Sequence, residues 1–67
     1  MMIGSLVREI ETDPEWILHP GEVGVIIRPA DEDMGLNIKP EMISRHWEIL
    51  WSDGLEIVLD TDLEVVA

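Results

Sequence analysis

Apolar residues fall in five short runs along the chain, separated by segments rich in Gly, Pro and Asp. Each run holds β-branched or other large apolar side chains, and such runs between turn-forming residues are typical of strands. The expected strands are residues 5–10, 23–29, 45–51, 55–59 and 63–66. The pattern therefore predicts an all-β protein.

The connections between these runs predict specific turns. Asp53-Gly54 separates the third and fourth runs, and Asp-Gly favours a tight β-hairpin because it accepts positive φ. Residues 60–62 suffice for a tight turn or one turn of 3₁₀ helix. Pro40 can begin a helical turn over residues 40–43, because proline is tolerated at the first helical position.

Alternation along each strand predicts which residues share a face of the sheet. We expect the core to be formed by one set from three strands: Val23, Val25, Ile27, Trp47, Ile49, Trp51, Leu55, Ile57 and Leu59. The opposite set still contains Ile26, Leu50 and Val58, which are apolar. We expect part of this outer face to be covered by the loop around Trp16 and the rest by a partner chain.

Five short strands in a flat sheet would leave two free edges, and curling into a small barrel reduces that liability. The long first connection, the tight hairpin and the short turn before the last strand match the order of an SH3-like barrel. We therefore expect one domain over residues 1–67, folded as a five-stranded SH3-like barrel.

The chain is strongly acidic, with 15 Asp and Glu against 4 Lys and Arg and a net charge of −11. Such a charge repels nucleic acid and anionic membranes, whose binding depends on Lys and Arg. It keeps a domain soluble, or it presents an acidic patch to a basic partner, for which Asp31, Glu32 and Asp33 are the candidates. No run approaches the roughly 20 apolar residues of a membrane span, and the absence of cysteine fits a cytoplasmic location.

The residues that carry chemistry form no recognisable site in the sequence. His19 and His46 are the two histidines, and no cysteine can complete a zinc site, so both are expected at the surface. The acidic run that begins at Asp31 does not fit a calcium loop, because Gly35 stands where an oxygen ligand is needed. No serine or threonine lies in a nucleophile motif. We expect no enzymatic activity, no metal and no cofactor.

Four segments resemble motifs of small SH3-like proteins of the KOW and Tudor-like type. They are GSLV at residues 4–7, GEVGVI at 21–26, WEILWSDG at 47–54 and DLEVV at 62–66. Their order is similar to that of short SH3-like proteins encoded by tailed and marine phages. The resemblance implies a non-enzymatic binding scaffold, phage-encoded and located in the host cytoplasm.

The ligands of related domains fit this sequence poorly. A KOW-type nucleic-acid-binding domain needs basic residues, and a Tudor-type methyl-lysine cage needs several aromatic residues, whereas three Trp are the only aromatic rings besides the histidines. We expect an interaction or assembly module with an unknown protein partner or a second copy of itself. Its candidate interface is Trp16, Ile26, Leu50 and Val58. The alternatives are an acidic inhibitor that mimics nucleic acid on a basic host protein and, disfavoured by charge, a KOW-type domain.

Overall fold

The computed structural model describes residues 1–10, 19 and 21–67, and most of its regular structure is strand. The strands are β1 (Leu6–Glu9), β2 (Gly24–Pro29), β3 (His46–Trp51), β4 (Gly54–Leu59) and β5 (Leu63–Val65). The helical segments are η2 (Glu32–Met34), α1 (Pro40–Ile43) and η3 (Asp60–Asp62). Every strand predicted from the sequence is present, with its ends within one residue, and so are both predicted helical turns.

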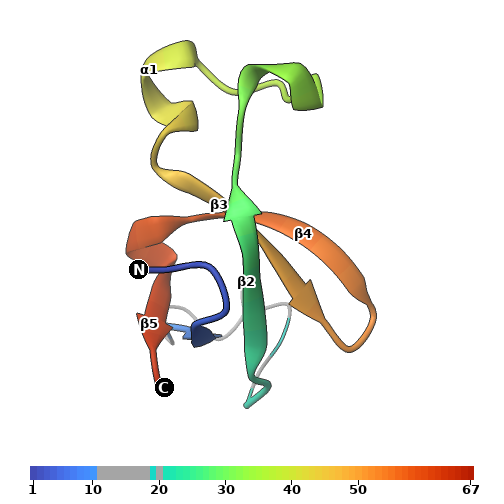
Figure 1. The fold of residues 1–67 in the computed structure, drawn as a ribbon, viewed down its shortest axis with the longest axis vertical. Coiled ribbons are helices and arrows are strands. Elements are labelled where there is room, and N and C mark those ends of the chain that lie inside the picture. The colour runs from blue at the N-terminus through green and yellow to red at the C-terminus, as the bar shows by residue number, and fades with distance from the viewer. Residues whose placement is uncertain (11–18, 20) are drawn as a thin grey trace.

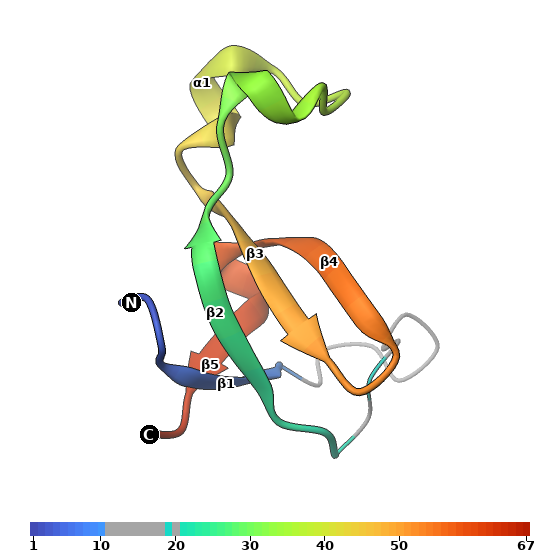
Figure 2. The ribbon, with the colours of Figure 1, turned by 45° about the vertical axis from the view of Figure 1, so that its right-hand side comes forward.

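The five strands form one antiparallel sheet in the order β4-β3-β2-β1-β5 (Figures 1 and 2). The all-β prediction is therefore confirmed. Strands β4 and β5 are the two edges of the sheet and do not pair with each other, so the sheet is not closed. Among the described helices, none has the length and apolar character needed to cross a bilayer.

The predicted hairpin between β3 and β4 is confirmed, with a detail that the sequence did not predict. Trp51 pairs with Gly54, so Ser52 and Asp53 are the two loop residues and Gly54 is the first residue of β4. Gly54 has φ 131°, a backbone conformation that glycine adopts most easily.

The two-residue loop fixes the faces of β3 and β4, because opposite residues of an antiparallel pair project to the same side. Trp47 lies opposite Val58, and Ile49 lies opposite Glu56. The predicted core face of β3 is confirmed, since Ile49 is fully buried. The predicted core face of β4 is wrong, since Val58 is buried whereas Leu55 is 60% exposed.

The predicted core face of β2 is wrong as well. Ile26 lies opposite Ile49 and is buried, whereas Val23 and Ile27 are exposed. The pairing with β3 also shifts register between Ile26 and Arg28, so simple alternation does not continue to the end of this strand.

Gly24 explains why the alternation of side chains predicts the wrong buried face for β2. It lies on the buried face without a side chain, so that face appears less apolar than it is. A Cβ added there would lie 2.6 Å from Ile49 Cγ2 and 2.7 Å from Trp51 Cε3. The Trp51 ring thus fills the space that a side chain at residue 24 would need.

We call the buried side of the sheet its inner face and the other side its outer face. The core cluster lies on the inner face and consists of Val7, Ile26, Ile49, Trp51, Val58 and Leu63, with Trp47 packed against it. Segments η2 and α1 lie beyond the end of β2, whereas the β3–β4 turn lies at the opposite end of the sheet (Figures 1 and 2).

Candidate functional site

The structure separates the residues predicted to form an interface. Leu50 is 45% exposed on the outer face, as expected. Ile26 is 1% exposed and Val58 is 7% exposed, so the expectation that they lie on the outer face is wrong. The strand registers described above turn both side chains into the core. Trp16 lies outside the described residues.

A row of apolar side chains nevertheless crosses the outer face. Leu6 pairs with Val25, Val25 with Leu50, and Leu50 with Leu55, so the row spans four adjacent strands. Its three leucines are all exposed, at 38%, 45% and 60% along the row, and Val25 is partly buried. We call Leu6, Val25, Leu50 and Leu55 the leucine row.

The charged strand residues beside the leucine row are balanced. Arg8 Nε donates to Glu64 Oε2 at 2.9 Å, and Arg28 Nε donates to Glu48 Oε1 at 3.2 Å. Arg8 lies two residues from Leu6 and Glu48 two residues from Leu50, which places both pairs on the outer face. The outer face thus combines apolar side chains with two ion pairs of zero net charge.

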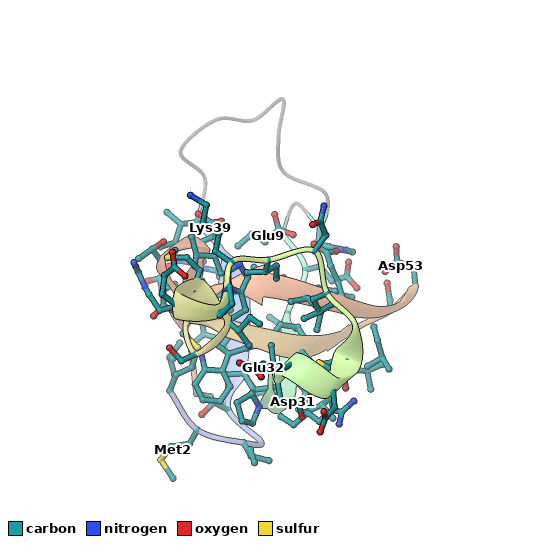
Figure 3. The ribbon with its side chains drawn as sticks, turned by 90° about the horizontal axis from the view of Figure 1, so that it is seen from above. Met2, Glu9, Asp31, Glu32, Lys39 and Asp53 are labelled. Atoms are coloured by element: carbon teal, nitrogen blue, oxygen red, sulfur yellow. The ribbon has the colours of Figure 1, made fainter. Side chains whose placement is uncertain are left out.

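The predicted acidic patch lies in the η2 segment, beyond the end of β2 and at the opposite end of the sheet from the β3–β4 turn (Figures 1 and 2). Asp31, Glu32 and Asp33 are exposed in and before η2. Figure 3, viewed down the long axis, labels Asp31 and Glu32 on this segment and Asp53 at the tip of the β3–β4 hairpin. The patch therefore joins neither the leucine row nor the cluster described next.

His19 is buried, in contrast to the surface position expected from the sequence. Its side chain is 5% exposed. Its ring stacks on the Trp51 ring, with the two centroids 4.4 Å apart and the planes 9° from parallel. The stacking fixes the plane of the imidazole ring and therefore the directions in which its two nitrogens can form hydrogen bonds.

Carboxylates surround both nitrogens of this ring. Nε2 lies 2.6 Å from Glu56 Oε2 and 3.9 Å from Glu9 Oε1. Nδ1 lies 3.2 Å from Glu22 Oε2 and 3.6 Å from Asp53 Oδ1. We call His19, Glu9, Glu22, Asp53 and Glu56 the His19 cluster.

The inner face and the adjoining turns position these side chains. Glu9 ends β1 and lies two residues from buried Val7, and Glu56 lies opposite Ile49 in β4. Glu22 precedes β2, and its second oxygen, Oε1, accepts the backbone N–H of Ser52 at 2.6 Å. The cluster thus forms where β1, β4, the β3–β4 turn and the residues before β2 meet.

The surroundings determine the protonation of the ring. Ionised carboxylates only accept hydrogen bonds, so a ring that bonds Glu22 through Nδ1 and Glu56 through Nε2 must donate from both nitrogens. Burial lowers the pKa of His19, but hydrogen bonding and charge attraction from Glu56, followed by Glu22 and Asp53, together raise it above 6.5. Both the hydrogen-bond geometry and the raised pKa favour the doubly protonated, imidazolium form of His19.

The Ser52 hydrogen bonds have the opposite effect on Glu22. They favour its ionised form and, with a smaller contribution from His19, lower the pKa of the carboxyl below 4.5. Glu22 is therefore a fixed, ionised acceptor for Nδ1 of the ring.

Two buried polar atoms of this region have no hydrogen-bond partner among the described residues. They are Glu9 Oε1, which faces His19 Nε2, and Trp51 Nε1 on the stacked ring. Buried polar groups without partners are uncommon and costly, so each calls for an explanation. The donor atoms of Glu9, His19 and Glu56 lie within 4.8 Å of one another, close enough to share a metal ion.

The sequence did contain one signal for this cluster. A two-residue hairpin places Glu56 opposite Ile49 on the core face, and a carboxylate in a core needs a partner. The identity of that partner depends on the fold, because Glu9, His19 and Glu56 are distant in the sequence.

Comparison with protein-family models, with curated proteins and with solved structures gives no match to this chain. The resemblance to SH3-like phage proteins accordingly stays a prediction.

Proposed function

We propose that this chain is a small SH3-like interaction module that associates with a second copy of itself through the outer face of its sheet. The leucine row supports this proposal. Its three leucines are exposed side by side on four paired strands, so one flat contact can bury all of them. Contiguous apolar patches of this kind mark binding surfaces more often than isolated exposed leucines do.

Charge favours a second copy as the occupant. The two ion pairs beside the row use 2 of the 4 basic and 2 of the 15 acidic residues, which leaves 2 − 13 = −11, the whole net charge, on the rest of the chain. As far as the described strands show, two copies can therefore meet face to face at the leucine row without opposing excess carboxylates. A basic partner would instead bind best to the surfaces that carry the excess carboxylates.

The available area is sufficient for a specific contact. A standard interface removes about 800 Å² from each partner. That is about one sixth of the 4610 Å² accessible surface of this chain, an amount that one face of the sheet can supply.

Sedimentation equilibrium from micromolar to millimolar concentration tests this function. We expect a monomer–dimer equilibrium that added salt strengthens, because salt screens the repulsion between two chains of charge −11. Leu50→Ser should weaken the dimer by about tenfold or more, since it places a hydroxyl at the centre of the row.

Val65→Ser is the matched control for this substitution. Val65 is 47% exposed, close to the 45% of Leu50, but it pairs with buried Val7 and so lies on the inner-face side of β5. The dissociation constant of the Val65→Ser dimer should stay within about threefold of the wild-type value. A strict monomer at every concentration, or equal effects of the two substitutions, would rule out the leucine row as the interface.

A further inference from the structure

The His19 cluster has more negative charge than its one cation can balance. Glu9, Glu22, Asp53 and Glu56 all approach the ring within 3.9 Å, so four carboxylates surround a single imidazolium. Glu9 Oε1, moreover, is buried and accepts no hydrogen bond from the described residues. A carboxylate oxygen shielded from water in this way is stabilised by a second positive charge or by a proton.

The two sides of the His19 ring are not equivalent. On the Nδ1 side, Glu22 is held by the Ser52 N–H and accepts a hydrogen bond from the ring. Histidines that bind metals through one nitrogen usually donate the other N–H to a carboxylate in this way. On the Nε2 side, Glu56 and Glu9 offer oxygens and the ring offers a lone pair once its proton leaves.

We propose that His19 Nε2, Glu9 and Glu56 bind a divalent transition-metal ion, with zinc as the best match, in place of the Nε2 proton. Zinc accepts imidazole nitrogen and carboxylate oxygen at about 2.0–2.2 Å, which gives donor–donor separations of about 3.3 Å in a tetrahedral site. The two separations from Nε2 are 2.6 Å and 3.9 Å, one shorter and one longer than that value. Small rotations of the two Glu side chains bring both to the required distance.

The remaining parts of the cluster fit the same role. Trp51 stacks on the ring and holds its plane, while Glu22 keeps the proton on Nδ1 so that Nε2 faces the ion. The imidazole ligand favours zinc over magnesium and calcium, which prefer oxygen. Three protein ligands leave the fourth position of the ion for water or for a group from a partner.

Calorimetric titration of the chelator-treated full chain with zinc chloride tests the site. We expect one ion per chain, a higher melting temperature in zinc than in chelator, and at least about tenfold weaker binding of magnesium. Replacement of zinc by cobalt(II) should give the visible absorption of a tetrahedral ion.

Two substitutions and one control test the carboxylate ligands. Glu9→Gln and Glu56→Gln should each weaken zinc binding by about tenfold or more, because each replaces a charged ligand with an amide. Glu48→Gln is the matched control: its side chain is 15% exposed against 13% for Glu9, but it pairs with Arg28 on the outer face. Zinc affinity of this control should stay within about threefold of the wild type.

A second readout keeps the test valid if a Glu variant is unstable. In the wild-type chain labelled at histidine, zinc should remove the Nε2 proton of His19 and leave the Nδ1 proton, as followed by nitrogen NMR. No zinc binding, an Nε2 proton that persists in zinc, or equal losses in Glu9→Gln and Glu48→Gln would overturn the proposal. The last result would show adventitious binding by surface carboxylates.

Discussion

The leucine row and the His19 cluster are opposite exceptions to the usual distribution of side chains. In the row, leucines that could enter a core lie in water, with exposures of 38–60%. In the cluster, a histidine that usually lies at the surface is 5% exposed and has four carboxylates around it. The row has balanced charges beside it, whereas the cluster has excess negative charge.

Each exception costs stability in a different way. A fully exposed leucine forgoes about 1.5–3 kcal/mol of burial, and the leucines of the row, at 38–60% exposure, forgo a part of this that a partner surface can recover. The buried Oε1 atom of Glu9 loses hydration that a proton, a hydrogen-bond donor or a cation can replace. Sites where a chain departs from its own folding pattern are where function is expected, and the two departures here call for different ligands: an apolar surface for the row and a cation for the cluster.

The largest expected effect is on the free energy of unfolding. It comes from comparing substitutions at two neighbouring residues of β3 that lie on opposite faces of the sheet. Ile49→Ala removes a fully buried side chain from the core and should lower the free energy of unfolding by about 2–5 kcal/mol. A 67-residue domain has roughly 3–10 kcal/mol in total, so this variant should be largely unfolded at moderate denaturant. Urea unfolding followed by circular dichroism gives the value.

Leu50→Ala is the control for this comparison. Its side chain is 45% exposed on the other face, so at concentrations where the chain is monomeric it should change the free energy of unfolding by about 0.5 kcal/mol or less. Equal losses at residues 49 and 50 would contradict the assignment of inner and outer faces.

These two faces also show where sequence patterns succeed and fail. Strand ends and turns were predicted within one residue because they depend on local residues such as Asp53-Gly54 and Pro40. The faces of β2 and β4 were predicted wrongly because they depend on pairing between strands. A two-residue hairpin requires Trp47 and Val58 to share a face, so the inner face of β4 follows from the length of the hairpin loop together with the face of β3.

The inner face of β2 and the His19 cluster are hidden from sequence patterns for another reason, which is that each depends on contacts between distant residues. Gly24 hides the inner face of β2, because its place is filled by Trp51, a residue of another strand. Glu9 of β1 and Glu56 of β4 meet His19, which belongs to no strand, only in the folded sheet, and no spacing in the sequence encodes that meeting. The burial of His19 is therefore visible in the folded structure and not in the sequence pattern.

Gly24→Ala should link the core to the His19 cluster. The added Cβ would lie 2.6–2.8 Å from atoms of Ile49 and Trp51, so the Trp51 ring must move and the stacked His19 ring with it. We expect a loss of about 1–3 kcal/mol in the free energy of unfolding. Zinc affinity should fall as well, whereas the dimer constant should not change.

Val23→Ala is the neighbouring control for this substitution. Val23 is 50% exposed and should lose about 0.5 kcal/mol or less. If Gly24→Ala proved as stable as the wild type, the close packing of Trp51 against the backbone of β2 would be refuted.

The His19 cluster should make the free energy of unfolding in chelator depend on pH. The pKa of His19 is raised above 6.5, so its contribution is complete below pH 6.5 and is lost as the pH rises through the folded value. The pKa of Glu22 is lowered below 4.5, so its contribution is present above pH 4.5 and is lost as the pH falls through the folded value. Both contributions are present between pH 4.5 and 6.5.

Melting temperatures of two variants between pH 5 and 9 isolate the alkaline part of this dependence. His19→Asn should lack the loss of stability above pH 6.5. His46→Asn, in which the other histidine is replaced, should keep it, because this substitution leaves His19 and its carboxylate partners in place. An unchanged pH profile in His19→Asn would show that the ring does not hold a proton between the carboxylates.

The smallest expected effect concerns the acidic residues of the η2 segment, Asp31, Glu32 and Asp33. They are exposed, and no hydrogen bond or ion pair to their side chains is found within the described part of the chain. Replacing the three with Asn, Gln and Asn should change the free energy of unfolding by about 0.5 kcal/mol or less. The change should be an increase, because it relieves repulsion between like charges. Zinc affinity should stay within about threefold. A larger loss of zinc affinity would mean that carboxylate density alone binds the ion, and the distinction between a charged surface and a cluster built around His19 would no longer hold.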